Sequence, residues 1–585
     1  MCMSKYFNCL FFVLLAACNS SNKQNNAASQ NDDISFNDFQ PRFLDAYWEQ
    51  NPSSAIFVGY GKYYDELIIP DSNSFVQSVA FSKQWLDSLH SYNYNNLSDD
   101  NKINYNIIQN QLQSAVWYID TFKSQQRDPS SYNIGGECYY LLTQNYAPLT
   151  QRLQTLSKHI QHTTEYYTAA QKTINHPTKE YTDLAIKQNE GSIDIFGAAL
   201  TDSIKGSSLT DAEKDTLNNR VKATVSAIKN YVGFLKKITA DKNYAFSDFR
   251  IGKSLFAQKF KYDLVTDYTP EQMFAKADSA KQYYHRQMFT IADTLWEKYY
   301  GTSKKPADSL TLIKLVLDKL SLNHASPQTV VDTATKLVHD LEYFIKAKDL
   351  FNYDTSYPLK VRIMPAYMAG VSLANAESTP AYQKSGVTYY NIMDLSKMPS
   401  ADAESELREY NTYSLQFLSM HEAMPGHCMQ GVYNNKSGSI VKSVFGNGAM
   451  IEGWAVYCEQ MMMENGWGNN TPELWLVLYK WRLRECSNVL IDYGIQCLNY
   501  SEDDVYKLLK NETFQEDAQI KEKYHRATVS QVQLCSYFNG LSDILSLREA
   551  YKIKTGNNYS LKDFHEKFLS YGSAPVKYIK EVMLK

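Results

Sequence analysis

The sequence has no large excess of charge of either sign, and this absence argues against a nucleic-acid partner. The 585 residues include 59 Lys and Arg and 63 Asp and Glu, which gives a formal net charge of −4. The two signs are well mixed along the chain, so no basic stripe is available to follow a phosphate backbone. We therefore do not expect DNA or RNA among its partners.

Long apolar runs, flexible linkers and a disulfide framework are also missing. The apolar run Cys9–Ala17 is far shorter than the ~20 residues of a membrane-spanning helix. No Pro/Gly-rich linker divides the rest of the chain. The cysteines after Cys18 follow no recognisable disulfide spacing: Cys138, Cys428, Cys458, Cys486, Cys497 and Cys535. We interpret Cys428 and Cys458 as buried core residues rather than soft metal ligands.

The first residues are typical of an export signal. Lys5 precedes the apolar run, and Leu15-Ala16-Ala17-Cys18 resembles the bacterial lipobox, whose cysteine is diacylated and becomes the mature N-terminus. An ordinary signal peptide cut nearby is the alternative. Residues 18–33 are rich in Asn, Ser and Gln, which predicts a disordered tether. We therefore predict a signal peptide at 1–17 and a bacterial lipoprotein anchored through Cys18, on the periplasmic or outer-membrane face.

Residues 34–585 predict a mainly α-helical fold. Helical periodicity recurs along the chain, and Thr269-Pro270-Glu271 is typical of a helix start. We expect a large two-lobed helical body around a deep cleft, with the catalytic part at about 355–585. Two β-favouring runs, 361–365 and 386–391, predict a small sheet near the metal-binding helix. That sheet either adds an extended peptide to its edge or is a structural hairpin.

Two histidines and a glutamate form the first chemical motif, His421-Glu422-Ala-Met-Pro425-Gly426-His427. Zinc sites in enzymes use imidazole and carboxylate ligands and leave one position open. The two histidines are ~120° apart on a regular helix and could not share one ion there. Because Pro425 lacks an N–H and Gly426 permits unusual backbone angles, we expect a two-residue expansion of the turn to return His427 to the metal.

The second motif, Glu452-Gly-Trp-Ala-Val-Tyr-Cys-Glu459, places two carboxylates within ~20° of one face of an expected helix. We assign Glu452 as the third ligand and Glu459 as the acceptor for a histidine ring N–H, with the reverse assignment left open. A solvated helix face is the alternative, but two carboxylates beside large aromatic residues favour a cation. By contrast, we interpret the pair His159 and His162 as part of a solvated face.

The remaining chemistry falls to three further residues. Glu422 follows a metal-ligand histidine directly, where zinc hydrolases carry the general base. A developing oxyanion also needs a donor, for which the C-terminal region offers Arg526, Gln533 and Tyr537. We therefore take Glu422, Tyr537 and Arg526 as the catalytic residues and one zinc ion as the cofactor.

The two motifs together resemble the bacterial family called domain of unknown function 885, whose members are often exported lipoproteins thought to be related to zinc metallopeptidases. The resemblance extends to residues 361–365, to Gln533–Tyr537 with Gly540, and to 561–579, and it covers most of the mature chain. It implies His421 and His427 as ligands, Glu422 as base and a glutamate of the second motif as third ligand. The chain departs from the family at Gln531-Val532-Gln533, where Pro-Gly-Gln is usual.

Together these observations predict a zinc metallopeptidase that cleaves short peptides. Two alternatives stay open: a zinc hydrolase of another amide or ester, and a non-catalytic lipoprotein that binds a ligand. The same activated water serves a peptide or another amide, so the sequence does not separate the first two. The presence of Glu422 favours an enzyme over a binding protein. The sequence does not predict an oligomeric state.

Overall fold

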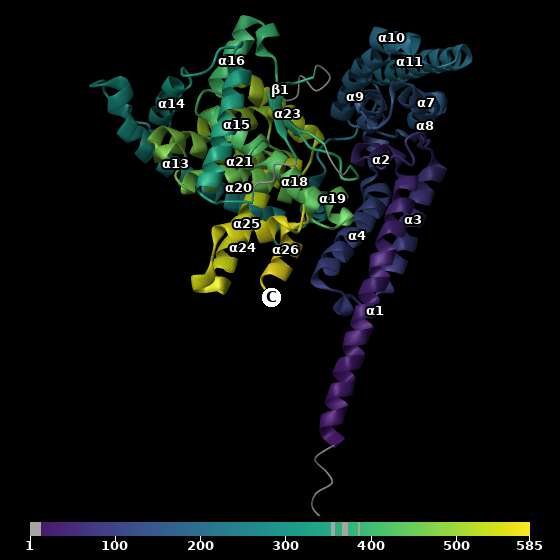
Figure 1. Cartoon of the computed structure of the whole chain (residues 1–585). Coiled ribbons are helices and arrows are strands. Elements are labelled where there is room, and N and C mark those ends of the chain that lie inside the picture. Colours follow the sequence, from purple (N-terminus) through teal and green to yellow (C-terminus); the bar gives the residue numbers. More distant parts are fainter. Residues whose placement is uncertain (1–12, 353–356, 366–372, 384–385) are drawn as a thin grey trace, which may run out of the picture.

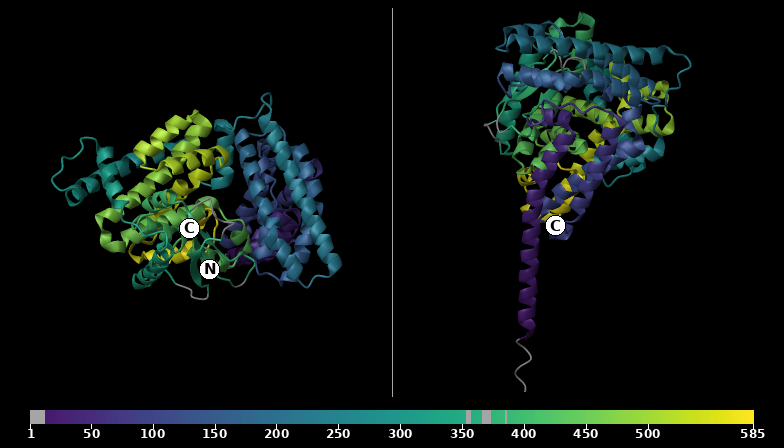
Figure 2. Two further views of the ribbon diagram at one scale, coloured as in Figure 1. Left: turned by 90° about the horizontal axis from the view of Figure 1, so that it is seen from above. Right: turned by 90° about the vertical axis from the view of Figure 1, so that its right-hand side faces the viewer.

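The computed structural model describes residues 13–352, 357–365, 373–383 and 386–585, and this part of the chain is mainly α-helical. Helices dominate every view, with the N-terminal helices as a layer beside the C-terminal ones (Figures 1 and 2). The predicted mainly α fold class is confirmed, whereas the deep cleft between two lobes stays a prediction. None of the helices in the described part combines the length and apolar character needed to cross a membrane.

The N-terminal part contains a series of helices joined by short connections. They are α1 (Val13–Gln50), α2 (Pro52–Val58), α3 (Ser72–His90), α4 (Asp99–Trp117), α5 (Ser124–Arg127), α6 (Gly135–Thr143), α7 (Leu149–His159), α8 (Thr163–Thr173), α9 (Lys179–Ser192), α10 (Ala198–Gly206) and α11 (Asp211–Ala240). Side chains of α6–α11 pack into one apolar cluster, around Leu153, Tyr167 and Tyr231.

The segment 18–33, predicted to be a disordered tether, is helical in the structure. It belongs to α1, whose N-terminal part projects away from the body (Figure 1). Further along, Phe36, Phe39 and Phe43 are buried and anchor the helix. A helix that is already nucleated extends at low cost, even through polar residues. The predicted signal peptide lies largely outside the described residues, and nothing is described of the Cys18 side chain.

His159 is also placed differently from its prediction. It is 0 % exposed, 3.7 Å from Glu137, on the face of α7 that buries Leu153 and Leu156. The interpretation as a solvated face is therefore wrong for His159, because the apolar periodicity of α7 includes this position. His162 is exposed, as expected.

The C-terminal part carries the rest of the helices. They are α12 (Gly252–Leu264), α13 (Pro270–Tyr300), α14 (Ser309–Leu320), α15 (Val330–Ala347), α16 (Ser400–Glu409), α17 (Ser414–Glu422), α18 (His427–Lys436), α19 (Ile440–Val444), α20 (Gly448–Glu464), α21 (Pro472–Leu498), α22 (Glu502–Lys507), α23 (Asp517–Val529), α24 (Ser536–Thr555), α25 (Leu561–Leu569) and α26 (Val576–Met583). As predicted, α13 starts at Thr269-Pro270, where Thr269 and Gln272 form a capping box.

The predicted small sheet is confirmed, with one strand more than expected. Strands β1 (Leu359–Ile363), β2 (Ala374–Glu377) and β3 (Thr388–Ile392) lie in the order β1-β3-β2. The two predicted runs, β1 and β3, pair in parallel and so form no hairpin with each other. The extra strand β2 pairs antiparallel with β3 at the other edge. Its sequence, Ala-Asn-Ala-Glu, lacks the β-branched residues by which a strand is recognised.

Helices α20 and α24 cross at two glycines. A Cβ on Gly453 would lie 2.3 Å from the carbonyl carbon of Gly540, and one on Gly540 would lie 1.8 Å from the carbonyl oxygen of Ala449. Only glycine permits this approach. The crossing brings the start of α24, with Tyr537, close to the start of α20, with Glu452.

Candidate metal centre

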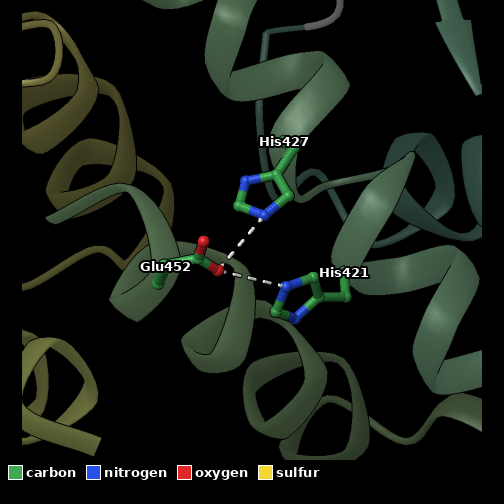
Figure 3. A group of neighbouring side chains, drawn as sticks. All are labelled: His421, His427 and Glu452. Carbon is green, nitrogen blue, oxygen red and sulfur yellow. Dashed lines mark ion pairs between the residues drawn. The ribbon is translucent and has the colours of Figure 1, made fainter. Parts of the chain in front are cut away.

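Three predicted ligands converge on one point from three different helices. His421 at the end of α17, His427 at the start of α18 and Glu452 near the start of α20 point toward one another (Figure 3). Glu452 Oε2 lies 3.6 Å from Nε2 of His421 and 3.5 Å from Nε2 of His427. The potential ligand atoms of all three residues lie within 4.8 Å of one another, and two of the side chains are only half-buried. The site is therefore compact and accessible.

The chain between the two histidines breaks the helix rather than expanding one turn of it. Helix α17 ends at Glu422, and Ala423 leaves helical geometry with φ −96° and ψ −86°. Helix α18 then starts at His427. The expected expansion by two residues is thus replaced by a full break, and the two imidazole rings still meet at right angles, with centroids 4.8 Å apart.

Gly426 and helix α20 hold this break in place. The N–H of Gly426 donates to the carbonyl of Met420 at 2.9 Å. A Cβ on Gly426 would lie 1.9 Å from the carbonyl oxygen of His421, so no larger residue fits. On the other side, Trp454 Nε1 donates to the carbonyl of Pro425 at 3.0 Å. The predicted role of the Pro-Gly pair is therefore accompanied by a tight backbone contact that no spacing argument could reveal.

Glu459 lies where a residue that orients His421 would be needed. Its Oε1 is 2.8 Å from Nδ1 of His421, on the ring nitrogen opposite to the one facing Glu452. Burial alone would lower the pKa of His421, but the carboxylates of Glu452 and Glu459 raise it well above its usual range. Glu452, the predicted ligand, thus lies on the Nε2 side of the His421 ring, and Glu459, the predicted acceptor for the ring N–H, lies on the Nδ1 side.

Sequence reasoning missed the residue that holds Glu459. Arg482 of α21 is fully buried and donates to Glu459 Oε2 at 2.5 Å. It also donates to Glu485 Oε2 at 2.5 Å and to the carbonyl of Val456 at 3.0 Å. Burial raises the pKa of Glu485 to about 7, against the opposing effect of Arg482. The available signal was an arginine and a glutamate three apart within a largely apolar helix.

Gln430 is a second missed residue. Its Oε1 lies 3.4 Å from Nδ1 of His427, one turn along α18, and its Nε2 contacts the sulfur of Met450. Both predicted histidine ligands therefore have a polar partner on the nitrogen that faces away from Glu452. The spacing of three residues along a helix could have indicated this contact.

Glu422 lies beside the three ligands and contacts the sheet. Burial raises the pKa of its carboxyl above the ordinary value, while His427 and His421 act in the opposite direction. The backbone N–H of Ala376 in β2 donates to this carboxyl. The backbone N–H and C=O groups of alternate residues in β2 point toward β3. The N–H of Met393 donates to the carbonyl of Leu373 at 2.7 Å, so the backbone groups of Leu373 point toward β3. Those of Ala376, three residues further on, therefore point to the outer edge. The outer edge of β2 therefore borders the candidate base.

The predicted oxyanion donors form a group near Glu452. Arg526 Nη2 donates to Gln533 Oε1 at 2.7 Å and to Tyr537 Oη at 3.2 Å. Burial raises the pKa of Tyr537, and the charge of Glu452 adds to this effect. Burial lowers the pKa of Arg526, but Tyr537 and Glu452 raise it and prevail. The structure thus brings Arg526 and Tyr537 into the electrostatic environment of the ligands.

The loop before Tyr537 keeps a glycine-like backbone without glycine. Val532 has φ +74° and ψ −30°, a region that β-branched residues rarely adopt. Its side chain is fully buried, and Tyr181 Oη donates to the neighbouring Gln531 at 3.0 Å. The departure from Pro-Gly-Gln at 531–533 therefore leaves Gln533 in contact with Arg526.

Two solved structures are similar to the whole chain. A candidate lipoprotein of unknown function from Shewanella oneidensis is 41% identical, with a TM-score of 0.86, and the match covers 94% of this chain and 100% of that one. A candidate lipoprotein from Colwellia psychrerythraea is 16% identical, with a TM-score of 0.73 and coverage of 96% and 98%, and shows the same fold. A comparison with curated proteins finds no match.

A family model extends this likeness to sequence. The model described as bacterial protein of unknown function, DUF885, matches residues 52–583. That range includes all three predicted ligands, Glu422, Glu459 and the group around Arg526, and excludes the N-terminal segment. The chain therefore belongs to the bacterial DUF885 family.

Proposed function

We propose that this protein is a zinc-dependent hydrolase, and that it cleaves short peptides as a metallopeptidase. The convergence of His421, His427 and Glu452 from three helices is the observation that carries the proposal. It is supported by Glu422 beside the ligands and by Glu459 on the far nitrogen of His421.

The donor set fits zinc. Two imidazole nitrogens and one carboxylate oxygen are the donors of catalytic zinc sites, which keep a fourth position open. Two donors bound to one tetrahedral zinc at 2.0–2.1 Å would be about 3.3 Å apart. The observed separations of 3.5 and 3.6 Å are close to this value. Metal-binding histidines are usually oriented by a partner on the other ring nitrogen, and Glu459 and Gln430 lie in that position for His421 and His427.

The chain's own residues supply the proton transfers and the charge stabilisation. Zinc, when bound, provides a Lewis acid that polarises a carbonyl and acidifies water. Glu422 accepts a proton from the attacking water while the water oxygen forms its bond to the amide carbon. It then returns that proton to the leaving nitrogen as the C–N bond breaks. Arg526 and Tyr537 donate to the carbonyl oxygen as negative charge develops there.

The outer edge of β2 favours a peptide over other amides. An extended peptide can pair with a strand edge through backbone hydrogen bonds. Ala376 directs its N–H toward this edge, and the same N–H donates to Glu422. A peptide paired with β2 would therefore pass the candidate base, and this pairing would hold the scissile bond close to the metal ligands.

We further propose that the protein is an exported lipoprotein anchored through Cys18. The proposal rests on the lipobox-like sequence at 15–18 and on the similar proteins from Shewanella oneidensis and Colwellia psychrerythraea, which are described as candidate lipoproteins. Attachment on the periplasmic or outer-membrane face would bring the enzyme to peptides outside the cytoplasm.

Metal content is the first test of this function. The soluble form starting after Cys18 is expected to bind about one zinc per chain, and a His427→Ala variant to lose it. Glu422→Gln should keep the metal and lose hydrolysis across a panel of short peptides and acylated amino acids. Zinc retained by His427→Ala would remove that ligand, and full activity of Glu422→Gln would refute the assignment of the base.

A further inference from the structure

Lys523 on α23 has no hydrogen-bond or ion-pair partner within the described residues, although its side chain is half-buried. The cationic side chains around it are Arg484 from α21 and Arg526 from its own helix, and the anionic ones are Glu409 and Glu522. Burial lowers the pKa of Lys523 well below its usual range, and the charges of Arg484 and Arg526 lower it further. Burial and the two guanidinium groups therefore disfavour the charged form of Lys523 in the free protein, and an anion placed beside it would favour that form.

The neighbouring charges are already engaged with other partners. Glu409 accepts from Lys480 at 2.8 Å through one oxygen and from Arg484 at 3.0 Å through the other. Arg526 donates to Gln533 and Tyr537. Glu522, the preceding residue, is exposed to solvent. Within the described residues, no carboxylate therefore forms an ion pair with the ammonium group of Lys523.

Its position relates Lys523 to the metal centre. Lys523 and Arg526 are three residues apart, so their side chains leave the same face of α23, with Cβ atoms about 5–6 Å apart. Arg526 contacts Tyr537, and the charge of Glu452 acts on both Arg526 and Tyr537. Lys523 is thus one helical turn from Arg526, which is itself in the electrostatic environment of the predicted ligand Glu452.

We propose that Lys523, with Arg526 beside it, binds a free carboxylate of the substrate next to the scissile bond. This inference rests on the proposed function and narrows its substrate class to peptides or acylated amino acids that carry a carboxylate close to the bond that is cut. The anion would pair with the lysine and relieve the repulsion among the three cations. A charge-assisted bond of this kind corresponds to about a 10- to 100-fold gain in affinity.

Binding to an inactive enzyme tests the site without relying on turnover. Zinc-loaded Glu422→Gln protein would be titrated with four probes: a short peptide with a free C-terminus, its C-terminal amide, the same amide with an acidic side chain, and an acylated amino acid. We expect the free acid to bind about 10- to 100-fold more tightly than the plain amide. The other two probes identify the source of the carboxylate.

Substitutions on α23 locate the effect. Lys523→Met should abolish the preference for the acid, and Lys523→Arg should retain most of it. Lys521→Met, which removes an exposed lysine from the same helix, should leave it unchanged. Equal binding of acid and amide, absence of binding of all probes, or an equal loss in Lys521→Met would each overturn the inference.

The inference and the proposed function fail in different ways. Equal rates of hydrolysis of acid and amide by the wild-type enzyme would refute the carboxylate site and leave the hydrolase proposal standing. A preference for the acid that depends on Lys523, without hydrolysis of any substrate, would support the site and refute the enzyme.

Discussion

Replacing Arg482 by Met should destabilise the protein strongly, because it leaves two carboxylates buried without their shared partner. The side chain is 1 % exposed, and its nitrogens lie 2.5 Å from both Glu459 and Glu485. Removing one partner from a buried ionic group costs about 3–5 kcal/mol, against a total stability of about 5–15 kcal/mol for a typical domain. Zinc affinity should also fall about 10- to 100-fold, since Glu459 would no longer be held against His421.

Urea unfolding and zinc titration measure these two effects. Lys314→Met provides the matched control, because Lys314 forms an exposed pair with Asp318 that contributes at most about 1 kcal/mol. The loss in Arg482→Met should be smaller at pH 5 than at pH 8, because the pKa of Glu485 is raised to about 7 and its carboxyl is charged at pH 8. If Arg482→Met and Lys314→Met lost the same stability at both pH values, the reasoning about the buried network would be wrong.

Two further predictions concern the helix break and the response to pH. Gly426→Ala should lower the free energy of unfolding in urea by about 3 kcal/mol or more and reduce zinc content, since the new Cβ would lie 1.9 Å from the His421 carbonyl oxygen. The control Gly233→Ala, whose Cβ meets nothing within 4 Å, should be neutral or stabilising. Equal effects of the two substitutions would contradict the packing argument. Burial raises the pKa of Asp492 to about 7. The unfolded chain releases this proton near pH 4 and the folded chain near pH 7, so the free energy of unfolding should fall by roughly 4 kcal/mol as pH rises across that interval. Asp492→Asn should remove this share of the slope in urea titrations between pH 4 and 8 and leave the share of Glu485, whose pKa is also raised to about 7. An unchanged slope would show that Asp492 contributes nothing to it.

Local spacing predicted the parts of the site that lie on single helices. Glu452 and Glu459 are seven residues apart, and they do face the same region, one toward each nitrogen of His421. The need for a distortion between His421 and His427 also followed from helix geometry, because no regular helix could bring the two rings together. Its form did not follow, since the expected two-residue expansion of the turn is a break between two helices in the structure. Chemistry and periodicity were sufficient here, since all the information lies within a few turns of chain.

Contacts between distant helices could not be predicted in this way. Arg482 reaches Glu459 across α20 and α21, and the crossing at Gly453 and Gly540 depends on two helices that approach until backbone touches backbone. Strand β2 carries no β-forming residues and exists because β3 pairs with it. The helix over residues 18–33 was not predicted for a related reason, because composition says nothing of a helix that continues from buried aromatic anchors. The catalytic roles stay predictions until metal and activity are measured.

Val532 has a consequence for how relatives of this protein are found. Its strained backbone costs about 1–3 kcal/mol, and burying a valine side chain contributes about 1.5–3 kcal/mol, so the two effects nearly cancel. A bulky residue can thus hold a backbone conformation here that glycine adopts without strain. A sequence pattern that demands Pro-Gly-Gln at this position would reject this chain, although Val532 keeps a positive φ there, so searches for relatives should allow residues other than glycine at this position.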